Sequence, residues 1–288
     1  MENISYDKTG KIDLNGIYNN DDPVPYFSTL SKLGYRIPEE GKPIFERLIA
    51  ARREAHEARE TKLIDLGCSY GVNAALLKHG MEMDDLYRLY GEDAPHETAL
   101  VARDRALFAE PTDRHLEIVG IDPADKAVAY AVETGLIDAA VAANLEKADP
   151  ERDDAAAIAG ADLIISTGCI GYVTQASLAR LIEAAEPGRP WMAHFVLRMF
   201  PFAPIEEMLA EHGYVTEKLD GVFPQRRFAS PEEQAHVLDN LDRLGLDPTG
   251  LEASGWYYAE LHVSRPPADA GLPLDTLVEA GERAPVHA

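Results

Sequence analysis

The fold of this chain is decided by the stretch Lys62-Leu-Ile-Asp65-Leu-Gly67-Cys-Ser69-Tyr-Gly71-Val-Asn-Ala-Ala-Leu-Leu77. An apolar run enters a glycine-containing turn and continues directly into a run of helical composition, which predicts a strand, a tight turn and a helix. The two glycines permit the turn and a close approach of helix and strand. The first turn of the helix points free N–H groups at the crevice beside it. This arrangement is typical of proteins that hold a nucleoside-bearing cofactor.

The middle position of the turn is occupied by Ser69. In the dinucleotide fingerprint G-x-G-x-x-G this position is a glycine, because the backbone approaches a pyrophosphate there. A side chain is better tolerated if the ligand carries no pyrophosphate. The stretch resembles the first motif of the class I S-adenosylmethionine-dependent methyltransferases, which commonly reads acidic-x-Gly-x-Ser/Gly-x-Gly, and Asp65, Gly67, Ser69 and Gly71 match it. The resemblance implies S-adenosyl-L-methionine as the cofactor.

Composition narrows the class of protein. A chain of 288 residues with 46% hydrophobic content can bury one substantial core, and we interpret it as one domain with appendages. The formal net charge of -23 disfavours nucleic acid and anionic membrane surfaces as partners. The sequence shows neither an apolar run of membrane-spanning length nor a secretory signal, so we expect a cytoplasmic protein. Its two cysteines, Cys68 and Cys169, cannot form a disulfide framework.

The order of predicted elements indicates the fold class. Apolar runs with strand character alternate with helical stretches, which predicts a doubly wound α/β fold with a mainly parallel sheet and helices on both faces. The resemblance implies seven strands, the last two forming an antiparallel edge. The expected strands cover 62–66, 117–121, 139–143, 161–166, 191–197, 214–219 and 256–263, and late helices cover 204–211 and 231–243, the latter starting with a capping box at Ser230-Pro231-Glu232-Glu233.

Three regions follow from these elements. Residues 1–58 form an N-terminal lid or extension, in which one helix covers 25–35 and a second begins with Pro43 near its first turn. Residues 59–265 form the methyltransferase-like core, with a charged helical insertion at 80–115. Residues 266–288 form a C-terminal tail.

Asp122 is the candidate for binding the ribose. It follows the second strand, where the family places an acidic residue on the two ribose hydroxyls, and Pro123 comes next. The alternative is that Asp122 only caps a helix with proline at its first position and an end near Gly135. We prefer the ribose role, although 51 positions separate Gly71 from Asp122 and the insertion must absorb them. Rival acids within the insertion are Asp84, Asp85 and Asp93, none of which follows a strand-like run.

Further cofactor contacts are implied by the family resemblance. Asn144 and Leu145 follow the third strand, where the family sets a polar residue against the adenine amino group and an apolar one on the ring; a polar turn explains Asn144 equally well. Thr167 and Gly168 begin the loop after the fourth strand, at the edge where open α/β sheets bind ligands. The predicted cofactor site comprises Asp65, Gly67, Cys68, Ser69, Gly71, Asn73, Asp122, Pro123, Asn144, Leu145, Thr167 and Gly168.

Candidates for catalysis and for substrate binding are less specific. Tyr172 and His194 are candidate general bases, although His194 lies in an apolar strand and suits a packed core histidine. The candidate substrate-binding residues are Tyr26, Tyr35, Arg36 and Arg198, of which the arginines equally suit ion pairs. Cys68 and Cys169 are expected close together as inert thiols. The histidine spacing disfavours a metal site.

The sequence thus predicts a methyltransferase that uses S-adenosyl-L-methionine and methylates a small molecule at nitrogen or oxygen by in-line transfer. The lid over its pocket is expected to comprise residues 18–50 and parts of 80–115. A NAD-dependent oxidoreductase and a cofactor-binding, non-catalytic regulatory subunit are the alternatives. Whether the chain forms a homodimer stays open.

Overall fold

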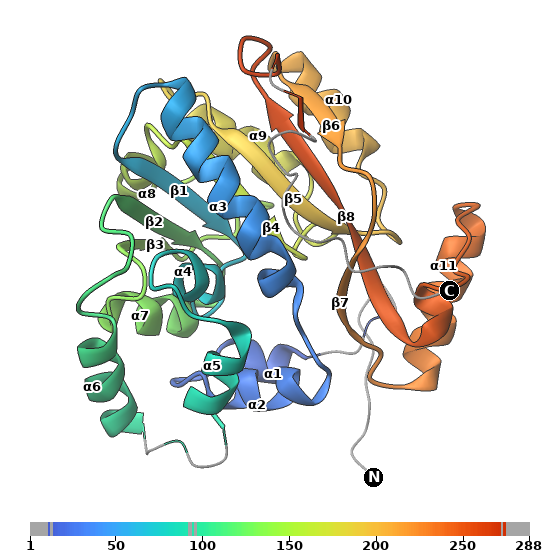
Figure 1. Ribbon diagram of the computed structural model, residues 1–288, viewed down its shortest axis with the longest axis horizontal. Helices are drawn as coiled ribbons and strands as arrows, with labels where there is room; N and C mark the ends of the chain where they lie inside the picture. Colours follow the sequence, from blue (N-terminus) through green and yellow to red (C-terminus); the bar gives the residue numbers. More distant parts are fainter. Residues whose placement is uncertain (1–10, 12–13, 92–93, 95–96, 272, 275–288) are drawn as a thin grey trace.

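The core of the protein is a sheet with a helical layer on each face (Figure 1). The computed structural model describes residues 11, 14–91, 94, 97–271 and 273–274, and within them the sheet has eight strands. The strands are β1 (Thr61–Leu66), β2 (Leu116–Ile121), β3 (Ala139–Val141), β4 (Leu163–Thr167), β5 (Trp191–Leu197), β6 (Val215–Lys218), β7 (Phe223–Arg227) and β8 (Trp256–Arg265).

The strand order is β3-β2-β1-β4-β5-β8-β6, with β7 also paired to β8. β1 to β5 are mutually parallel, and β8 is antiparallel to β5. The chain adds β2 and β3 on one side of β1 and then β4 and β5 on the other side. A crevice therefore forms outside the carboxyl ends of β1 and β4. The predicted doubly wound, mainly parallel α/β fold is confirmed.

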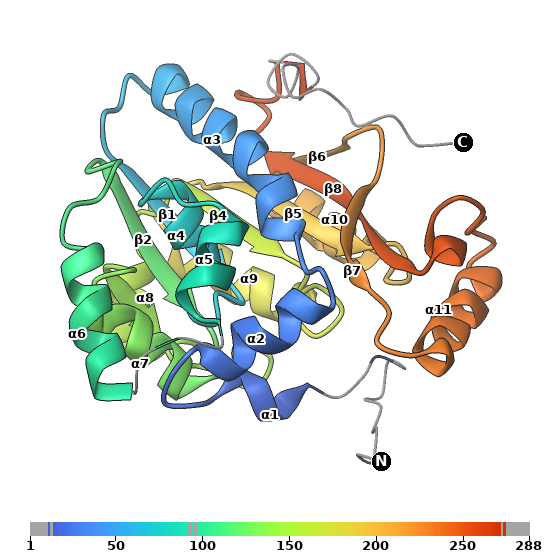
Figure 2. The same ribbon diagram turned by 60° about the horizontal axis from the view of Figure 1, so that its bottom comes forward.

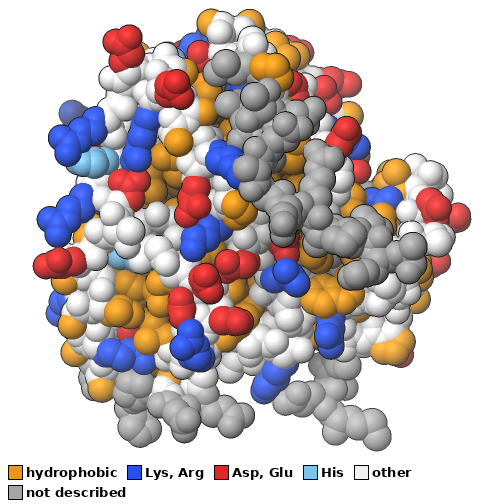
Figure 3. Space-filling view, viewed as in Figure 1, with side chains coloured by type: hydrophobic (Ala, Val, Ile, Leu, Met, Phe, Trp, Pro, Cys, Tyr) orange, Lys and Arg blue, Asp and Glu red, His pale blue; other side chains and the backbone are white. Residues whose placement is uncertain are grey.

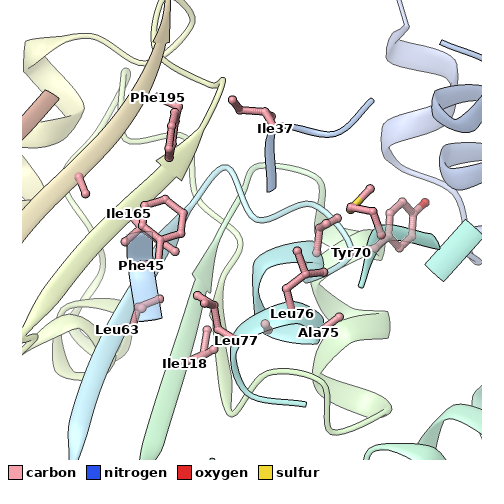
Figure 4. Packing of buried hydrophobic residues seen from close by; sticks show 14 of the residues in the cluster. Ile37, Phe45, Leu63, Tyr70, Ala75, Leu76, Leu77, Ile118, Ile165 and Phe195 are labelled. Atoms are coloured by element: carbon pink, nitrogen blue, oxygen red, sulfur yellow. The ribbon is translucent and has the colours of Figure 1, made fainter. Parts of the chain in front are cut away.

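The sheet is buried because its strands are apolar on both faces. One face packs against α3 (Ile37–Ala55), α4 (Val72–Leu77) and α7 (Asp125–Glu133), and the other packs against α8 (Arg152–Ile158), α9 (Gln175–Ala184) and α10 (Ala203–Glu211). Figure 4 shows the first layer: Ile37 and Phe45 of α3 point toward Phe195 and Ile165 of the sheet, and the Phe45 and Phe195 ring centroids are 5.5 Å apart. α3 therefore belongs to the core layer rather than to a cover over the crevice.

A smaller group of helices lies across the carboxyl ends of the parallel strands (Figures 1 and 2). It consists of α1 (Asn15–Tyr18) and α2 (Val24–Lys32), with α5 (Met83–Leu89) beside them. Phe27 of α2 stacks on Tyr90, with ring centroids 4.8 Å apart. The predicted insertion thus supplies α5 and also α6 (Glu97–Leu107), which contacts α7 at the edge of the molecule.

Three local predictions are wrong. α3 begins at Ile37 rather than at Pro43, because Pro38 and the acidic residues after it already provide a helix start, and Pro43 lies inside the helix. α7 begins at Asp125, three residues after Asp122, so Asp122 is not its N-cap. The sheet has an eighth strand, β7, in a segment where Pro224 argues against a strand; β7 pairs only at the edge of β8, where a proline is tolerated.

The C-terminal part is held to β7 by a buried ion pair. α11 (Pro231–Arg243) is capped by Ser230, whose Oγ accepts a hydrogen bond from Glu233 N at 3.1 Å, as predicted. The Glu233 carboxylate, however, bonds the Ala229 N–H at 2.7 Å and both terminal nitrogens of Arg226 at 2.8 and 3.0 Å. Both side chains are at most 5% exposed. A short 3-10 helix, η1 (Glu252–Ser254), leads into β8.

The described surface carries interspersed charges. On the face in Figure 3, Lys and Arg side chains alternate with Asp and Glu, without a continuous basic patch among the described residues. Among the described residues, none of the helices combines the length and the apolar character that crossing a bilayer demands. Asp93, one of the rival acids, and residues 275–288 of the tail lie outside the described residues.

We predict that Glu233→Ala destabilises the protein by about 3–5 kcal/mol, because Arg226 stays buried without its counter-ion. Chemical denaturation measures the loss. The neighbouring exposed Glu232→Ala is the matched control and should cost much less. The double variant Arg226→Met/Glu233→Leu should recover most of the stability, and a double variant as unstable as Glu233→Ala would contradict this explanation.

Candidate functional site

The glycine turn after β1 has the backbone conformation that the motif predicts. Gly67 and Gly71 have φ angles of +75° and +80°, in the left-handed region that favours glycine. A Cβ atom at Gly67 would lie 2.7 Å from Cys169 Cβ, and one at Gly71 would lie 2.9 Å from Leu136 Cδ2. Ser69 also lies in the left-handed region, with φ of +48°, and its buried Oγ has no hydrogen-bond partner. The turn is therefore close-packed and leaves one polar atom to be satisfied.

A buried carboxyl group lies at the base of this turn. Asp65 of β1 is fully buried, and its Oδ1 accepts a hydrogen bond from Asn73 Nδ2 at 2.8 Å. The same Asn73 nitrogen donates to Thr167 Oγ1 at 3.2 Å, which links β1, α4 and β4. Asp65 Oδ2 is buried without a partner. Burial raises the pKa of Asp65 to about 7, against the lowering effect of the Asn73 hydrogen bond.

Asp122 lies at the end of β2, beside the turn. β1 and β2 are neighbours in register, with Leu66 opposite Ile121. Asp122 Oδ2 accepts from the Ser69 N–H at 3.0 Å, and Oδ1 accepts from the Ala124 N–H at 2.9 Å. Burial raises the pKa of Asp122 as well. A carboxylate has about four lone-pair sites, so these two bonds leave capacity for two hydroxyl donors.

Aromatic side chains of the N-terminal helices cover the turn. The Tyr26 ring lies 5.6 Å from that of Tyr18 and 5.5 Å from that of Tyr70, measured between centroids. Tyr26 is buried, and burial raises the pKa of its hydroxyl. Tyr35 Oη donates to the Thr167 carbonyl at 3.4 Å. The structure thus brings Tyr26 and Tyr35 to the predicted cofactor residues.

Asn19 and Asn20 attach the cover, formed by Tyr18, Tyr26 and Tyr35, to the glycine turn and to the start of α7. Asn20 N donates to Tyr70 Oη at 2.8 Å, and Tyr70 Oη donates to Asn20 O at 2.9 Å. Asn19 Oδ1 accepts from the Lys126 N–H at 2.9 Å, and Asn19 Nδ2 donates to the Asp125 carboxylate at 2.8 Å. Asn19 therefore caps α7, the helix that follows Asp122 and Pro123, from outside the helix.

The loop after β3 contains a turn that is stabilised by a hydrogen bond to the Asn144 side chain. Asn144 is exposed, and its Oδ1 accepts from the Glu146 N–H at 3.1 Å, while Leu145 is buried. The Glu146 carboxylate accepts from the Thr174 N–H at 2.8 Å and from Ser177 Oγ at 2.6 Å. These bonds fasten the loop to the start of α9. The polar-turn role of Asn144 is thus present, and its carbonyl oxygen keeps a second lone pair.

The two cysteines lie close together, as predicted. Both are free thiols, and burial is the main cause of the raised pKa of Cys68, to which the neighbouring Cys169 adds a smaller effect. Burial likewise raises the pKa of Cys169 to about 12. Cys169 Sγ donates to the Leu66 carbonyl at 3.3 Å. Neither thiol has the lowered pKa of a nucleophile.

Two candidate residues do not reach the crevice. His194 is fully buried on β5, its Nδ1 shares a hydrogen bond of 2.8 Å with Ser166 Oγ, and burial lowers its pKa to about 3. It is a neutral core histidine, which removes the basis for assigning it as a general base. Arg198 Nη1 lies 2.6 Å from the Glu252 carboxylate, and its Nη2 donates to Asp247 O, so the guanidinium is already paired.

Two others lie at the surface. Arg36 forms an ion pair of 2.5 Å with Glu40, and its side chain is 51% exposed. Tyr172, in the loop after β4, is 40% exposed, and Lys11 Nζ lies 5.0 Å from the centre of its ring. Neither side chain makes a described contact with Asp65 or Asp122.

Sequence reasoning missed several residues of the crevice. Tyr18, Asn19 and Asn20 lie within the predicted lid but were given no individual role, and Tyr70 lies inside the glycine turn; together they form the cover and its attachment. Gln225 of β7 is 4% exposed and lies against Gly168, where an added Cβ would be 2.2 Å from Gln225 Nε2. Its strand was not predicted.

The residues that the structure describes contain no group of three or more His, Cys, Asp or Glu side chains arranged to hold a metal ion. The polar atoms of the crevice that lack partners are instead suited to hydrogen-bond donors of an organic ligand. They are Asp65 Oδ2, Ser69 Oγ and Gln225 Oε1.

The strand order, with an antiparallel β8 between β5 and β6, matches the mainly parallel sheet with an antiparallel edge that the family resemblance implies. No protein-family model and no curated protein sequence matches the chain.

Solved structures with a similar arrangement include the plantazolicin methyltransferase BamL in complex with a triazolic desmethylPZN analog and SAH, at 14% identity, TM-score 0.42, covering 82% of this chain and 90% of that one. Precorrin-6y C5,15-methyltransferase from Geobacter metallireducens GS-15 has 9% identity and a TM-score of 0.38, covering 91% and 98%. A TehB-like SAM-dependent methyltransferase from Corynebacterium glutamicum ATCC 13032 has 16% identity and a TM-score of 0.36, covering 74% and 85%. At these values function has to be inferred from the site itself.

We predict that the protein without ligand loses stability as the pH rises from about 4 to about 7, because of Asp65. Unfolded, this carboxyl releases its proton near pH 4, whereas in the fold it keeps the proton up to about pH 7. The unfolded state therefore binds fewer protons in this window, and the free energy of unfolding falls by up to roughly 4 kcal/mol.

Asp65→Asn, which resembles the protonated form, should remove this loss. Denaturant titrations at pH 5 and pH 8 should show the variant gaining stability relative to the parent protein at pH 8. An equal difference at both pH values would rule out Asp65 as the titrating group.

Proposed function

We propose that the protein is a methyltransferase that transfers a methyl group from S-adenosyl-L-methionine to nitrogen or oxygen of a small molecule. The observation that carries this proposal is the buried Asp65 carboxyl group, whose Oδ2 lacks a partner beside the glycine turn. A cation bound beside this carboxyl group favours its ionised form and is attracted to it, whereas an anionic ligand disfavours ionisation. S-adenosylmethionine carries an ammonium and a sulfonium group, whereas NAD carries a pyrophosphate.

The residues present fit the two halves of this cofactor. Asp122 would hold the ribose hydroxyls with the oxygen lone pairs that Ser69 and Ala124 leave over. Asp65 and Ser69 offer buried acceptors near the turn, to which the ammonium group would donate. The loop at Asn144 and Leu145 would bound the adenine. Ser69 at the middle position closes the approach that a pyrophosphate needs.

When bound, S-adenosylmethionine supplies a methyl group that its sulfonium activates for direct displacement. The contribution of the chain is to align donor and acceptor and to keep water out. The aromatic cover of Tyr18, Tyr26 and Tyr35 suits this role, since it places apolar surface over the carboxyl ends of β1 and β4. Burial raises the pKa of Tyr26 and Tyr35 above the ordinary value of tyrosine, so neither hydroxyl is suited to act as a general base.

The side chains around the glycine turn favour one charge type for the methyl acceptor. Arg198 and Arg36 bind Glu252 and Glu40 away from the crevice, and the side chains described around the glycine turn are acidic and tyrosine side chains. An acceptor molecule without an anionic group suits these surroundings better than a carboxylate.

Isothermal titration calorimetry tests the proposal. We expect binding of S-adenosylhomocysteine and S-adenosylmethionine and no binding of NAD. Asp122→Ala should weaken S-adenosylhomocysteine affinity by about hundredfold, through the loss of two charge-assisted hydrogen bonds.

Glu117→Ala, an exposed acid near the start of the same strand, is the matched control and should leave the affinity unchanged. Binding of NAD without S-adenosylhomocysteine would sink the proposal. Binding with no methyl transfer to any acceptor of a broad metabolite set would instead support the non-catalytic alternative.

We further predict that the cover slows cofactor release. Asn19→Ala removes two hydrogen bonds to the start of α7 and should raise the dissociation rate of S-adenosylhomocysteine about tenfold. Stopped-flow fluorescence measures this rate. Ser28→Ala on α2, whose hydroxyl donates to Pro25 O of the same helix, is the control. Equal dissociation rates in the parent protein and Asn19→Ala would show that the attachment does not retain the cofactor.

A further inference from the structure

Gln225 is a buried polar side chain that the seven-stranded core does not require. It belongs to β7, the additional strand, and is 4% exposed. Its Oε1 atom is fully buried and has no hydrogen-bond partner. An acceptor left unpaired in this way costs about 1–3 kcal/mol, so a donor that binds it contributes correspondingly to affinity.

The amide lies against the loop that ends β4. Gly168 has φ of +98°, and an added Cβ there would be 2.2 Å from Gln225 Nε2. The preceding residue, Thr167, is bonded through Oγ1 to Asn73 and through its carbonyl to Tyr35 Oη. Asn73 in turn holds Asp65. Neighbouring contacts therefore lead from the Asp65 carboxyl group, through Asn73 and the end of β4, to the Gln225 amide group.

The backbone of β7 fixes where this amide can lie. The Arg36 N–H donates to Gln225 O at 2.8 Å, and the Arg227 N–H donates to Leu33 O at 2.8 Å. Both bonds join β7 to the turn between α2 and α3, while β8 pairs with its other side. Because the strand is held on both sides, the amide is positioned before any ligand binds, which lowers the entropy cost of using it.

A donor with a positive charge fits this pair of acceptors best. Of the cations near β7, Arg226 is bound to Glu233. Asp65 supplies an acidic acceptor beside the glycine turn, and the buried Gln225 amide oxygen supplies a neutral one. An ammonium group has three donors and no acceptor, and hydrogen bonds to charged groups are the stronger ones.

We propose that Gln225 Oε1 accepts a hydrogen bond from the ammonium group of the cofactor's amino-acid moiety, opposite Asp65. The inference rests on the proposed use of S-adenosylmethionine and goes further by assigning a cofactor contact to β7. The amino-acid moiety is then held between Asp65 of β1 and Gln225 of β7, the strand that bonds to the turn between α2 and α3. In this way Gln225 and Tyr35 couple cofactor binding to the N-terminal helices that carry the cover.

Two ligands separate this contact from a general effect on the pocket. S-adenosylhomocysteine carries the amino-acid moiety, and 5′-methylthioadenosine has the same adenosine and thioether without it. In calorimetry, Gln225→Met should lower S-adenosylhomocysteine affinity about tenfold or more and leave 5′-methylthioadenosine affinity within about twofold. Gln225→Glu keeps an acceptor and should retain S-adenosylhomocysteine affinity at the parent level or above.

Gln234→Met is the matched control, because Gln234 is a second glutamine whose Nε2 bonds Glu252 O and Ala253 O away from the crevice. It should change neither affinity. Parallel losses of both ligands in Gln225→Met, or an unchanged ratio of the two affinities, would overturn the inference. If the parent protein binds neither ligand, the proposed function itself fails.

Discussion

The site depends on a carboxyl group that the fold keeps away from water. Asp65 is the penultimate residue of β1, between the buried Ile64 and Leu66, and it is held by Asn73, the second residue of α4. Because that nitrogen also binds Thr167, one amide fixes the relative positions of β1, α4 and β4. Burial raises the pKa of the carboxyl to about 7, so ionising it destabilises the ligand-free fold. An unpaired, buried acid of this kind is more useful for binding a cation than for stability.

The glycine turn that follows Asp65 positions Asp122 on one side of the crevice, and Thr167 lies on the other side. The Ser69 N–H, which the left-handed turn directs to β2, is bound by Asp122. The turn therefore fixes Asp122 at the distance that the β1 and β2 register sets. On the other side, Thr167 carries the contacts of Tyr35 and lies beside the glycine that Gln225 covers. Both acids and the cover thus depend on the geometry of a single strand-turn-helix.

The core was predictable because local composition and tertiary packing agree there. Strands β1, β2, β4 and β5 are apolar on both faces, which only a parallel sheet covered by helices accommodates. The antiparallel final strand came from the family resemblance. The misplaced start of α3 has a simple cause, since Pro38 and Pro43 are both compatible with a first helical turn and the packing of Ile37 decides between them.

The side chains at the rim were less predictable for a physical reason. His194 and Arg198 are residue types that often occur in functional sites. In this fold, however, His194 shares a hydrogen bond with Ser166 of β4, and Arg198 pairs with Glu252 of η1. Asn19 and Asn20 read as loop residues, yet they attach the cover to a turn and a helix about 50 and 106 positions away. Partners so distant in sequence leave no local pattern to read.

The glycine turn, the two acids and the alternation of strands and helices followed from the order of residues, because each depends on neighbours within a few positions. The crevice as a binding surface was decided by tertiary structure. Its cover, the unexpected strand β7 and the paired state of the arginines depend on contacts between distant segments, and the raised pKa of Asp65 depends on how completely those segments exclude water. Residue order thus specified the cofactor class that we propose, whereas packing specified which oxygen atoms stay unpaired and so available to a ligand.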